Sequence, residues 1–509
     1  MLEKYKVKIV SVDGLSEKID LFPRKSKVIM CHGVFDIVHP GHIRHLSYAK
    51  SKAEILVASI TSDKFVKKGR YRPHVPEDLR ALNLAAFEMV DFVIIDNNEK
   101  PLENIIKVKP DYFAKGYEYN KDLNYTKSTQ EEEEVLKSYG GEILFTPGDI
   151  VYSSSNILKN QTPDLSIEKL IISMKNENIT FNDLRSSLDK IEGEKVHILG
   201  DTIIDTYTKT NMIGGQTKTP TISVLFNSKE NFVGGAGVVA KHLQEAGANV
   251  TFTTVVGNDD LAKYAYENLK ESNIKVNWIT DETRPTTNKN VIIADSYRLL
   301  KIDTLDNRTI QPSILKQIQE KIENDTKNIL ILSDFRHGIF NKNTIPEITK
   351  SITENIFKVA DSQVASRWGN ITEFQGFDLI TPNEREARFA LADQDSTVGL
   401  LSEEIRQKSN AKSAFLKLGN KGMIATTRNG LDKNKYFILD SFTQNAIDPV
   451  GSGDALLAYG TLVLKVTKCI LTASIIGSLA AACACELDGN MPVKKDYISN
   501  KLKELEKLL

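Results

Sequence analysis

Short apolar runs that end in turn residues alternate with longer amphipathic stretches along most of this 509-residue sequence. Such runs are typical of buried strands and such stretches of surface helices, so the alternation predicts βαβ units and parallel sheets. The pattern is interrupted by the polar stretch 160–194 and begins again at Lys195. Since a single core rarely extends beyond about 300 residues, the sequence predicts an α/β protein with two domains.

The first domain is predicted to span residues 1–160 as a small doubly wound, Rossmann-like unit. Its expected strands are the following apolar runs: Lys27–Cys31, Glu54–Ile60, Phe92–Asp96, Tyr112–Lys115 and Glu142–Thr146. Helical patterns lie between them, notably Gly41–Ala53 and Glu77–Met89. The acidic run Glu131–Glu134 is interpreted as a solvated helix face without a functional role.

Residues 161–180 are predicted to form a linker, and residues 181–509 a second, larger α/β domain. The amphipathic segment Phe181–Ile191 is expected to be its entry helix. The main strands and helices expected after it are Val196–Leu199, Gly235–Ala246, Thr251–Val256, Ile329–Leu332, Phe377–Ile380 and Asp454–Val466.

Composition narrows the possible partners and compartment. The formal net charge of −1 gives no electrostatic argument for a nucleic-acid or membrane partner, and neither is expected. The four cysteines follow no zinc or disulfide spacing, which fits a reducing cytoplasm. The apolar stretch Cys469–Cys485 is short for a membrane span of about 20 residues, so it predicts a buried helix. The first residues lack the apolar core of a signal peptide, and a cytoplasmic location is expected.

Two histidines, His39 and His42, occur where an apolar strand and a glycine turn lead into a helix. Pro40 favours a helix start there, and the three-residue spacing places both histidines on one side of the first turn. The free N–H groups and the dipole of that turn form an anion site and disfavour imidazolium. Neutral histidines could hold phosphates during in-line attack on the α-phosphorus of a nucleotide, although capping and packing would also explain the pair.

The segment His32–His42, HGVFDIVHPGH, resembles the HxGH signature of the cytidylyltransferase-like nucleotidyltransferases, and the likeness covers about the first 160 residues. Further matching pieces lie at 67–70, 78–80, 114–116 and 153–158. The resemblance implies catalytic roles for His39, His42 and Lys68. It implies nucleotide or phosphate contacts at Gly33, Phe35, Asp36, Arg80, Lys115, Gly116, Ser153, Ser154 and Ser155.

The order of these pieces is most similar to the sugar-phosphate adenylyltransferases that make ADP-heptose. CTP-using glycerol-phosphate relatives have an Arg-Thr-x-Gly stretch before the serines, whereas this chain has Gly148–Tyr152. The departure favours ATP as the nucleotide, with CTP as the alternative.

A second candidate site is the segment Asp448–Asp454, DPVGSGD, directly before a predicted helix. Its glycines let the N–H groups of Gly451, Ser452 and Gly453 approach a γ-phosphoryl group, with the helix dipole behind them. Asp454 could then accept the proton of an attacking sugar hydroxyl. An ordinary loop with an N-capping aspartate is the structural alternative.

From about Phe181 to Leu509 the sequence resembles the ribokinase-like (PfkB) sugar kinases, an α/β fold with a β lid. Gly234–Gly237 is similar to the family's first glycine signature and Asp448–Asp454 to its second. The resemblance implies ATP and Mg²⁺, with Glu386 as an indirect Mg²⁺ ligand and Asp454 as the catalytic base. It implies sugar contacts at Asp201, Asp205, Gly234, Gly235 and Asp334, and nucleotide or phosphate contacts at Asn383, Glu386, Gly419, Gly422, Gly451, Ser452 and Gly453.

Three departures from that family concern the sugar side. Val238 follows the first glycine signature, where a sugar-contacting asparagine is usual. The lid stretch 216–220 lacks the Ser-Pro-Glu-Ala-Pro of heptose kinases, and Asp361-Ser-Gln363 replaces an Asp-Pro-Lys. A working kinase with an altered sugar pocket is therefore expected.

The fusion of the two domain types resembles the bifunctional heptose-7-phosphate kinase/heptose-1-phosphate adenylyltransferases of lipopolysaccharide-core synthesis, with the domain order reversed. It implies a sugar phosphate and a nucleoside triphosphate as substrates and, through relatives of both domains, a homodimer. One alternative is CTP-dependent activation of another sugar or polyol for a surface polymer. Another is a kinase-like domain that acts only as a sensor or dimerisation module. The sugar and its anomer, and any channelling, stay open.

Overall fold

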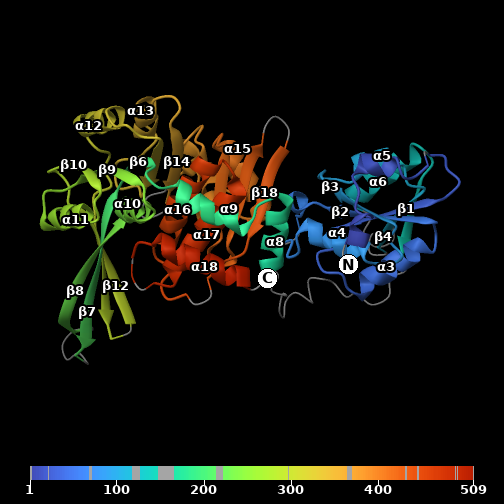
Figure 1. The fold of residues 1–509 in the computed structure, drawn as a ribbon, viewed down its shortest axis with the longest axis horizontal. Coiled ribbons are helices and arrows are strands. Elements are labelled where there is room, and N and C mark those ends of the chain that lie inside the picture. The colour runs from blue at the N-terminus through green and yellow to red at the C-terminus, as the bar shows by residue number, and fades with distance from the viewer. Residues whose placement is uncertain are drawn as a thin grey trace. The chain divides into compact units, whose positions relative to one another are not determined.

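The computed structural model describes residues 3–20, 22–67, 72–116, 126–146, 166–213, 222–295, 297–363, 369–429, 433–443, 446–487, 489 and 491–507. The chain forms two compact units, Met1–Ile172 with Asp395–Leu400 and Ser173–Gln394 with Leu401–Leu509 (Figure 1). Helix α8 (Ser166–Asn176) lies inside the stretch predicted as a linker. The predicted domain limits at residues 160 and 180 stay predictions.

The first unit contains one five-stranded sheet in which all strands run parallel, in the order β3-β2-β1-β4-β5. The strands are β1 (Val28–Gly33), β2 (Ile55–Thr61), β3 (Phe92–Asp96), β4 (Tyr112–Gly116) and β5 (Glu142–Thr146). The helices are α1 (Glu3–Lys6), α2 (Val12–Ser16), α3 (Pro40–Lys50), α4 (Glu77–Ala85), α5 (Leu102–Val108) and α6 (Lys127–Lys137), with a 3-10 turn η1 (Asp63–Phe65). This doubly wound arrangement confirms the predicted fold class.

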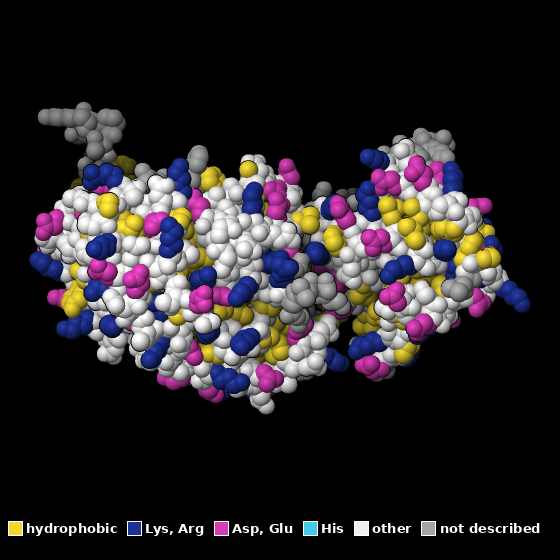
Figure 2. All heavy atoms as spheres, turned by 90° about the horizontal axis from the view of Figure 1, so that it is seen from above, with side chains coloured by type: hydrophobic (Ala, Val, Ile, Leu, Met, Phe, Trp, Pro, Cys, Tyr) yellow, Lys and Arg dark blue, Asp and Glu magenta, His cyan; other side chains and the backbone are white. Residues whose placement is uncertain are grey.

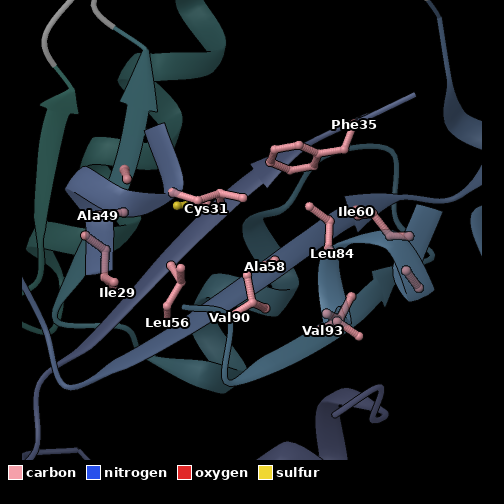
Figure 3. Close-up of a cluster of buried hydrophobic side chains, with 14 residues drawn as sticks. Ile29, Cys31, Phe35, Ala49, Leu56, Ala58, Ile60, Leu84, Val90 and Val93 are labelled. Carbon is pink, nitrogen blue, oxygen red and sulfur yellow. The ribbon is translucent and has the colours of Figure 1, made fainter. Parts of the chain in front are cut away.

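Alternate residues of β1 enter two separate cores because successive side chains of a strand point to opposite faces. On one face Ile29 packs in a cluster with Leu84 of α4, which Figure 3 shows. On the other face Val28 packs in a cluster with Ile105 of α5 and Leu136 of α6. A strand covered on both faces has to be apolar throughout, which is why the sequence of β1 reads as one continuous run.

The second unit is built on a nine-stranded sheet in the order β10-β9-β6-β13-β14-β15-β16-β17-β18. Its strands are β6 (Lys195–Gly200), β9 (Asn249–Val256), β10 (Lys275–Thr280), β13 (Ile329–Asp334), β14 (Phe357–Ser362), β15 (Leu379–Ile380), β16 (Ser413–Lys417), β17 (Met423–Asn429) and β18 (Lys433–Leu439). All pairs from β10 to β16 are parallel, and β17 and β18 add an antiparallel edge. The carboxyl ends of the parallel strands therefore lie at one edge, where α/β proteins bind ligands.

The helices of the second unit include a buried pair whose members pack on each other, α16 (Ser452–Thr467) and α17 (Ile470–Cys485). The others are α9 (Phe181–Lys190), α10 (Ala236–Glu245), α11 (Asp260–Glu271), α12 (Pro312–Glu323), α13 (Thr344–Lys350), α14 (Glu384–Leu391), α15 (Val398–Lys408) and α18 (Lys495–Lys507), with 3-10 turns η3 (Ile371–Glu373) and η4 (Gly419–Lys421). The burial of α17 confirms the prediction for the apolar stretch. In the described ranges no helix is long and apolar enough to cross a membrane.

A separate four-stranded sheet, the lid sheet, has the order β12-β11-β7-β8. It is formed by β7 (Thr202–Met212), β8 (Val224–Gly235), β11 (Thr287–Ala294) and β12 (Tyr297–Thr304). Figure 1 shows β7, β8 and β12 extending away from the larger sheet. Charged side chains of both signs are interspersed over the face seen in Figure 2, in keeping with the near-zero net charge.

Candidate active sites

His39 is the N-cap of α3, and its Nδ1 accepts a hydrogen bond from the backbone N–H of Gly41 at 3.1 Å. An accepting Nδ1 carries no hydrogen, so the hydrogen of the neutral ring is on Nε2. The ring of His42 stacks on that of His39 with centroids 3.9 Å apart, and it also contacts Phe35 at 5.1 Å. The helix start therefore holds two stacked imidazoles, and at His39 the N–H points away from the helix backbone.

Both histidines are held in the neutral form. Burial and the neighbouring imidazoles of His39 and His45 lower the pKa of His42 to about 4. Burial, followed by the charge of Arg44, lowers the pKa of His39. The sequence analysis expected neutral histidines because of the helix dipole, whereas burial is the main cause of the lowered pKa values in the structure. Neutral rings at a helix N-terminus can donate N–H groups to phosphate oxygens.

Gly33 ends β1, and the turn from there to α3 contains Phe35 and Asp36. Phe35 has a left-handed backbone with φ 48°, a conformation uncommon outside glycine. Asp36 is buried, and its Oδ1 accepts hydrogen bonds from the N–H groups of His74 and Val75 at 2.8 and 2.9 Å. Asp36 thus ties the HxGH turn to the loop that enters α4.

Arg80, for which the resemblance implied a nucleotide or phosphate contact, is fully buried in α4. Its guanidinium donates to the carbonyl of Val75 at 2.9 Å and that of Thr61 at 2.8 Å, and also to the carbonyl of Val34. It donates to the carboxylate of Asp63 at 2.6 Å as well. These contacts join three segments around the site, so the geometry favours a positioning role for Arg80.

Lys115 at the end of β4 forms an ion pair with Glu132 of α6 and donates to the hydroxyl of Thr129 at 3.1 Å. Glu132 is buried, so the interpretation of Glu131–Glu134 as a solvated face was wrong at this position. Helix periodicity explains the error, because one residue of such a run can face inward while its neighbours face water. Gly116 follows Lys115 as the last residue of β4.

Sequence reasoning missed a polar cluster at the carboxyl ends of β1, β2 and β3. Nδ1 of His32 contacts the hydroxyl of Ser59 at 2.9 Å and its Nε2 that of Thr61 at 3.2 Å. Burial, followed by the charge of Lys115, lowers the pKa of His32 to about 4. Burial raises the pKa of Asp96 to about 6 although Asn98 donates to it. Polar residues at the ends of apolar strands were the signal that could have revealed this cluster.

The predicted residues Lys68, Ser153, Ser154 and Ser155 lie outside the described residues.

In the second unit, α16 begins directly after Gly451. The φ of Gly451 is 81°, a left-handed conformation that glycine adopts without the steric cost of a Cβ atom. Ser452 and Gly453 form the first turn, and the hydroxyl of Ser452 donates to the carbonyl of Pro449 at 2.8 Å. Burial, with the charge of Asp361 next, raises the pKa of Asp454 to about 7. A carboxylate in the first turn with a pKa near neutrality is suited to general-base catalysis.

Lys417 is a residue of this edge that the sequence analysis did not identify. Its ammonium donates to Oδ1 of Asp361 at 2.8 Å, and the same oxygen accepts from the hydroxyl of Thr381 at 2.6 Å. Burial opposes the charged form, but Asp361 and Glu386 raise the pKa of Lys417 above its ordinary value. The lysine is therefore charged at neutral pH.

Asn383 and Glu386 form a capping box at the start of α14. The side chain of Asn383 accepts from the N–H of Glu386 at 2.9 Å, and Oε2 of Glu386 accepts from the N–H of Asn383 at 2.7 Å. Gly422, at φ 84°, has no room for a side chain, since a Cβ would lie 2.0 Å from the carbonyl oxygen of Leu439. Gly419 also has a positive φ, of 61°.

Asp201 and Asp334 are buried and hold the backbone of the adjacent loop. Oδ2 of Asp201 accepts from the N–H groups of Phe335 at 3.0 Å and His337 at 3.3 Å. Oδ2 of Asp334 lies 2.8 Å from Nε of Arg336 and accepts from the hydroxyl of Ser362 at 2.7 Å. The sugar contacts of these two carboxylates stay predictions.

Asp205 lies in the lid sheet, directly opposite Lys289 of β11, which is opposite Asp303 of β12. Burial raises the pKa of Asp205, and the charge of Lys289 opposes this rise. The ammonium of Lys289 also lies 5.9 Å from the ring centroid of Phe335. The carboxylate is thus part of a charged row across three strands.

The neighbouring glycines join the lid sheet to the start of α10. Gly234 is opposite Ile203 of β7, and Gly235 precedes α10 at φ 60°. A Cβ on Gly235 would lie 2.5 Å from the carbonyl oxygen of Asp201.

Among the described residues, no three His, Cys, Asp or Glu side chains converge on a candidate metal site. Mg²⁺ in phosphotransfer sites is held by one or two carboxylates and by the substrate phosphates. The single carboxylate of Glu386, fixed by its capping box, fits that kind of ligand set.

The nine-stranded sheet with its lid is the architecture of ribokinase-like sugar kinases, and the five-stranded sheet that of small nucleotidyltransferases. Residues 194–494 match the pfkB family of carbohydrate kinases, and the chain belongs to this family. Residues 30–161 match the cytidylyltransferase-like family, so the chain carries a nucleotidyltransferase domain followed by a sugar kinase domain. Both matches confirm the predicted families and their order.

Two similar proteins are bifunctional and have the same name. The chain is 25% identical over 297 residues to "Bifunctional protein HldE" of Sulfurimonas denitrificans, covering 56% of this chain and 60% of that protein. It is 36% identical over 154 residues to the protein of the same name from Geobacter metallireducens, covering 30% of each. The matches thus span less than two thirds of these relatives.

Among solved structures, phosphofructokinase-2 from Escherichia coli in complex with potassium superposes with a TM-score of 0.52 at 16% identity. The superposition covers 62% of this chain and 99% of that chain. At this identity the likeness shows the fold of the second domain.

Proposed function

We propose that this chain is a bifunctional enzyme of nucleotide-sugar synthesis. Its second domain phosphorylates a sugar phosphate similar to heptose 7-phosphate at the anomeric hydroxyl. Its first domain transfers a nucleotidyl group, with AMP favoured over CMP, to the resulting sugar 1-phosphate. The observation that carries the proposal is one chain with two phosphate-type sites, at His39/His42 and at Asp454.

In the kinase step, Asp454 accepts the proton of the sugar hydroxyl as its oxygen attacks the γ-phosphorus of ATP. The bond between the γ-phosphorus and the bridging oxygen breaks, and ADP leaves. The N–H groups of Gly451, Ser452 and Gly453 support the transferring phosphoryl group. When bound, Mg²⁺ would neutralise phosphate oxygens, and Glu386 would hold it indirectly.

In the nucleotidyl step, an oxygen of the sugar 1-phosphate attacks the α-phosphorus of the nucleoside triphosphate. The bond from the α-phosphorus to the bridging oxygen breaks, and pyrophosphate leaves. Neutral His39 and His42 donate to the triphosphate oxygens, and Lys68, Lys115 and the serines 153–155 are proposed to complete the phosphate site. We propose a cytoplasmic location for the enzyme, because the sugar 1-phosphate and the nucleoside triphosphate are both cytoplasmic substrates.

We further propose that the protein is a homodimer formed through the lid sheet. Several large apolar side chains are exposed on its strands: Met212, Leu225, Phe226, Tyr297, Leu300 and Ile302. A group of this kind on a protruding sheet is uncommon in a monomer. One structural relative, phosphofructokinase-2 from Escherichia coli, has a tetrameric inhibited form.

The test is product analysis by mass spectrometry with Mg²⁺, ATP, CTP and a panel of sugars and sugar phosphates that includes heptose 7-phosphate. ADP-heptose is the expected product. A CDP-linked or different sugar product would support the alternative of activating another sugar or polyol. Pyrophosphate release from supplied sugar 1-phosphates alone, without any phosphorylation, would contradict the kinase activity and favour a sensor or dimerisation role.

A further inference from the structure

A buried lysine–aspartate pair lies at the carboxyl edge of the nine-stranded sheet. Lys417 is the last residue of β16, and Asp361 is the last residue but one of β14, two strands away. The ammonium and the carboxylate are 2.8 Å apart, and their side chains are 15% and 2% exposed. Thr381, directly after β15, donates to the same carboxylate oxygen, so all three neighbouring strands contribute to the pair.

This pair lies against the N-terminus of α16. A Cβ built on Gly453 would be 3.5 Å from Nζ of Lys417. Gly453 is in the first turn of α16 and directly precedes Asp454. The ammonium is therefore beside the backbone N–H groups that are proposed to hold the phosphoryl group.

The charges around this turn are otherwise mostly negative. The charges of Asp361, Glu386 and Asp454 all act on Lys417. Carboxylates alone would repel a phosphoryl group, whose charge is spread over three equatorial oxygens during transfer. A lysine ammonium has three donors, and one of them is directed to Asp361.

We propose that Lys417 is a catalytic residue whose ammonium contacts the phosphoryl group passing from ATP to the sugar, with Asp361 as its positioning residue. The inference rests on the proposed kinase function. Lys417 stays protonated throughout, since the hydroxyl proton goes to Asp454 and the bridging oxygen leaves with ADP. Its contribution is electrostatic stabilisation of the transferring group.

The chain offers a matched control at the other end of the same strand. Lys412 donates to Asp378 at 2.7 Å, in a second lysine–aspartate pair that joins the chain before β16 to that before β15. The lysine there is 76% exposed and lies at the amino edge of the sheet, away from α16. K412M therefore removes a lysine from a similar pair without touching the candidate site.

Two measurements test the proposal on the full-length protein. Calorimetric titration compares the affinity for ADP with that for the imido analogue of ATP, and steady-state kinetics gives kcat and KM for ATP. We expect K417M to weaken binding of the imido analogue about tenfold, leave ADP binding unchanged and lower kcat by about 10²–10³-fold. K412M should change none of these quantities. Unchanged kcat and unchanged discrimination between the two nucleotides in K417M would overturn the proposal.

Because K417M leaves the Asp361 carboxylate without its cation, the double variant D361N/K417M separates folding from chemistry. We expect it to fold as judged by its melting temperature and to stay inactive. Recovery of kcat in the double variant would show a purely structural pair and overturn the proposal. D361N alone should lower kcat with little change in KM for ATP, as expected for a positioning residue.

The outcomes also distinguish failure of this inference from failure of the kinase function. Suppose that the wild-type protein phosphorylates no sugar but binds the imido analogue more tightly than ADP, and that K417M lacks this difference in affinity. The kinase function then fails, while the contact between Lys417 and the phosphoryl group stands. If the wild-type protein phosphorylates a sugar and K417M does so equally well, the kinase stands and the role of Lys417 fails.

Discussion

The backbone N–H of Gly41 donates to Nδ1 of His39 at 3.1 Å, and this contact sets the tautomer of the imidazole. The ring then has its hydrogen on Nε2, and the ring of His42 stacks on it at 3.9 Å. Capping and phosphate binding are therefore not competing roles for His39. One nitrogen caps the helix while the other is available to donate to a ligand.

The first prediction concerns His42. Replacing His39 would also remove the N-cap of α3, so His42 is the better test of phosphate binding. H42A should lower nucleotidyl transfer by about 10²–10³-fold, because one donor to the triphosphate is lost. Phosphorylation of the sugar should be unaffected. Separate assays of pyrophosphate release and of ADP formation check this, and a transferase indifferent to the change would contradict the first-site assignment.

The second prediction concerns the pH dependence of Asp454, whose pKa is raised to about 7. A general base has to be deprotonated, so kcat/KM for phosphorylation should fall as the pH decreases below about 7. D454N should abolish phosphorylation at every pH. A pH profile of the purified protein checks both statements, and surviving kinase activity in D454N would refute the base.

The same pKa has a consequence for stability. Because the pKa of Asp454 is higher in the folded protein than in the unfolded chain, the protein loses stability as the pH rises from the unfolded-state pKa, near 4, to the folded-state pKa of about 7. D454N should therefore raise the melting temperature at pH 8 relative to the wild type, by more than it does at pH 5. Thermal unfolding at the two pH values measures this difference, and an equal effect at both would argue against the raised pKa.

The sequence predicts the fold well where burial imposes a pattern. Parallel strands such as β1 are covered on both faces, so their continuous apolar runs mark them. The predicted strand Phe377–Ile380 is shorter in the structure, where β15 spans only Leu379–Ile380. Strand ends depend on partner strands, which are distant in sequence, and a local pattern carries no information on them.

The candidate sites were predictable in part. Glycine-rich turns and residues at helix starts, such as His39 and Asp454, belong to short contiguous motifs. Glu132 and Lys417 act through partners at Lys115 and Asp361, which tertiary structure alone brings together. For Arg80 the motif implied a ligand contact, which stays a prediction. The buried hydrogen bonds of its guanidinium indicate a positioning role that the motif alone did not reveal.

The fourth prediction concerns that role of Arg80. R80A should lower the free energy of unfolding of the first unit by about 3–5 kcal/mol, because it leaves the Asp63 carboxylate and several carbonyl groups without their partner. K107A is the control, since the pair of Lys107 with Asp13 is exposed and is worth at most about 1 kcal/mol. Chemical denaturation measures both. A change below about 1 kcal/mol in R80A would contradict the positioning role.

The last prediction concerns the lid sheet and the proposed homodimer. Leu300 and Ile302 are two residues apart on β12 and share one face, and each is about half exposed. Apolar side chains in such an arrangement lose contact with water when a second copy covers them, at about 25 cal/mol per Å². L300E should place a charge in that interface and convert the dimer to a monomer. The control is I106E, because Ile106 is equally exposed on α5 of the first unit. Sedimentation velocity at micromolar protein concentrations measures the state of each variant. A monomeric wild-type protein, or a dimer that L300E leaves intact, would contradict a lid-mediated assembly.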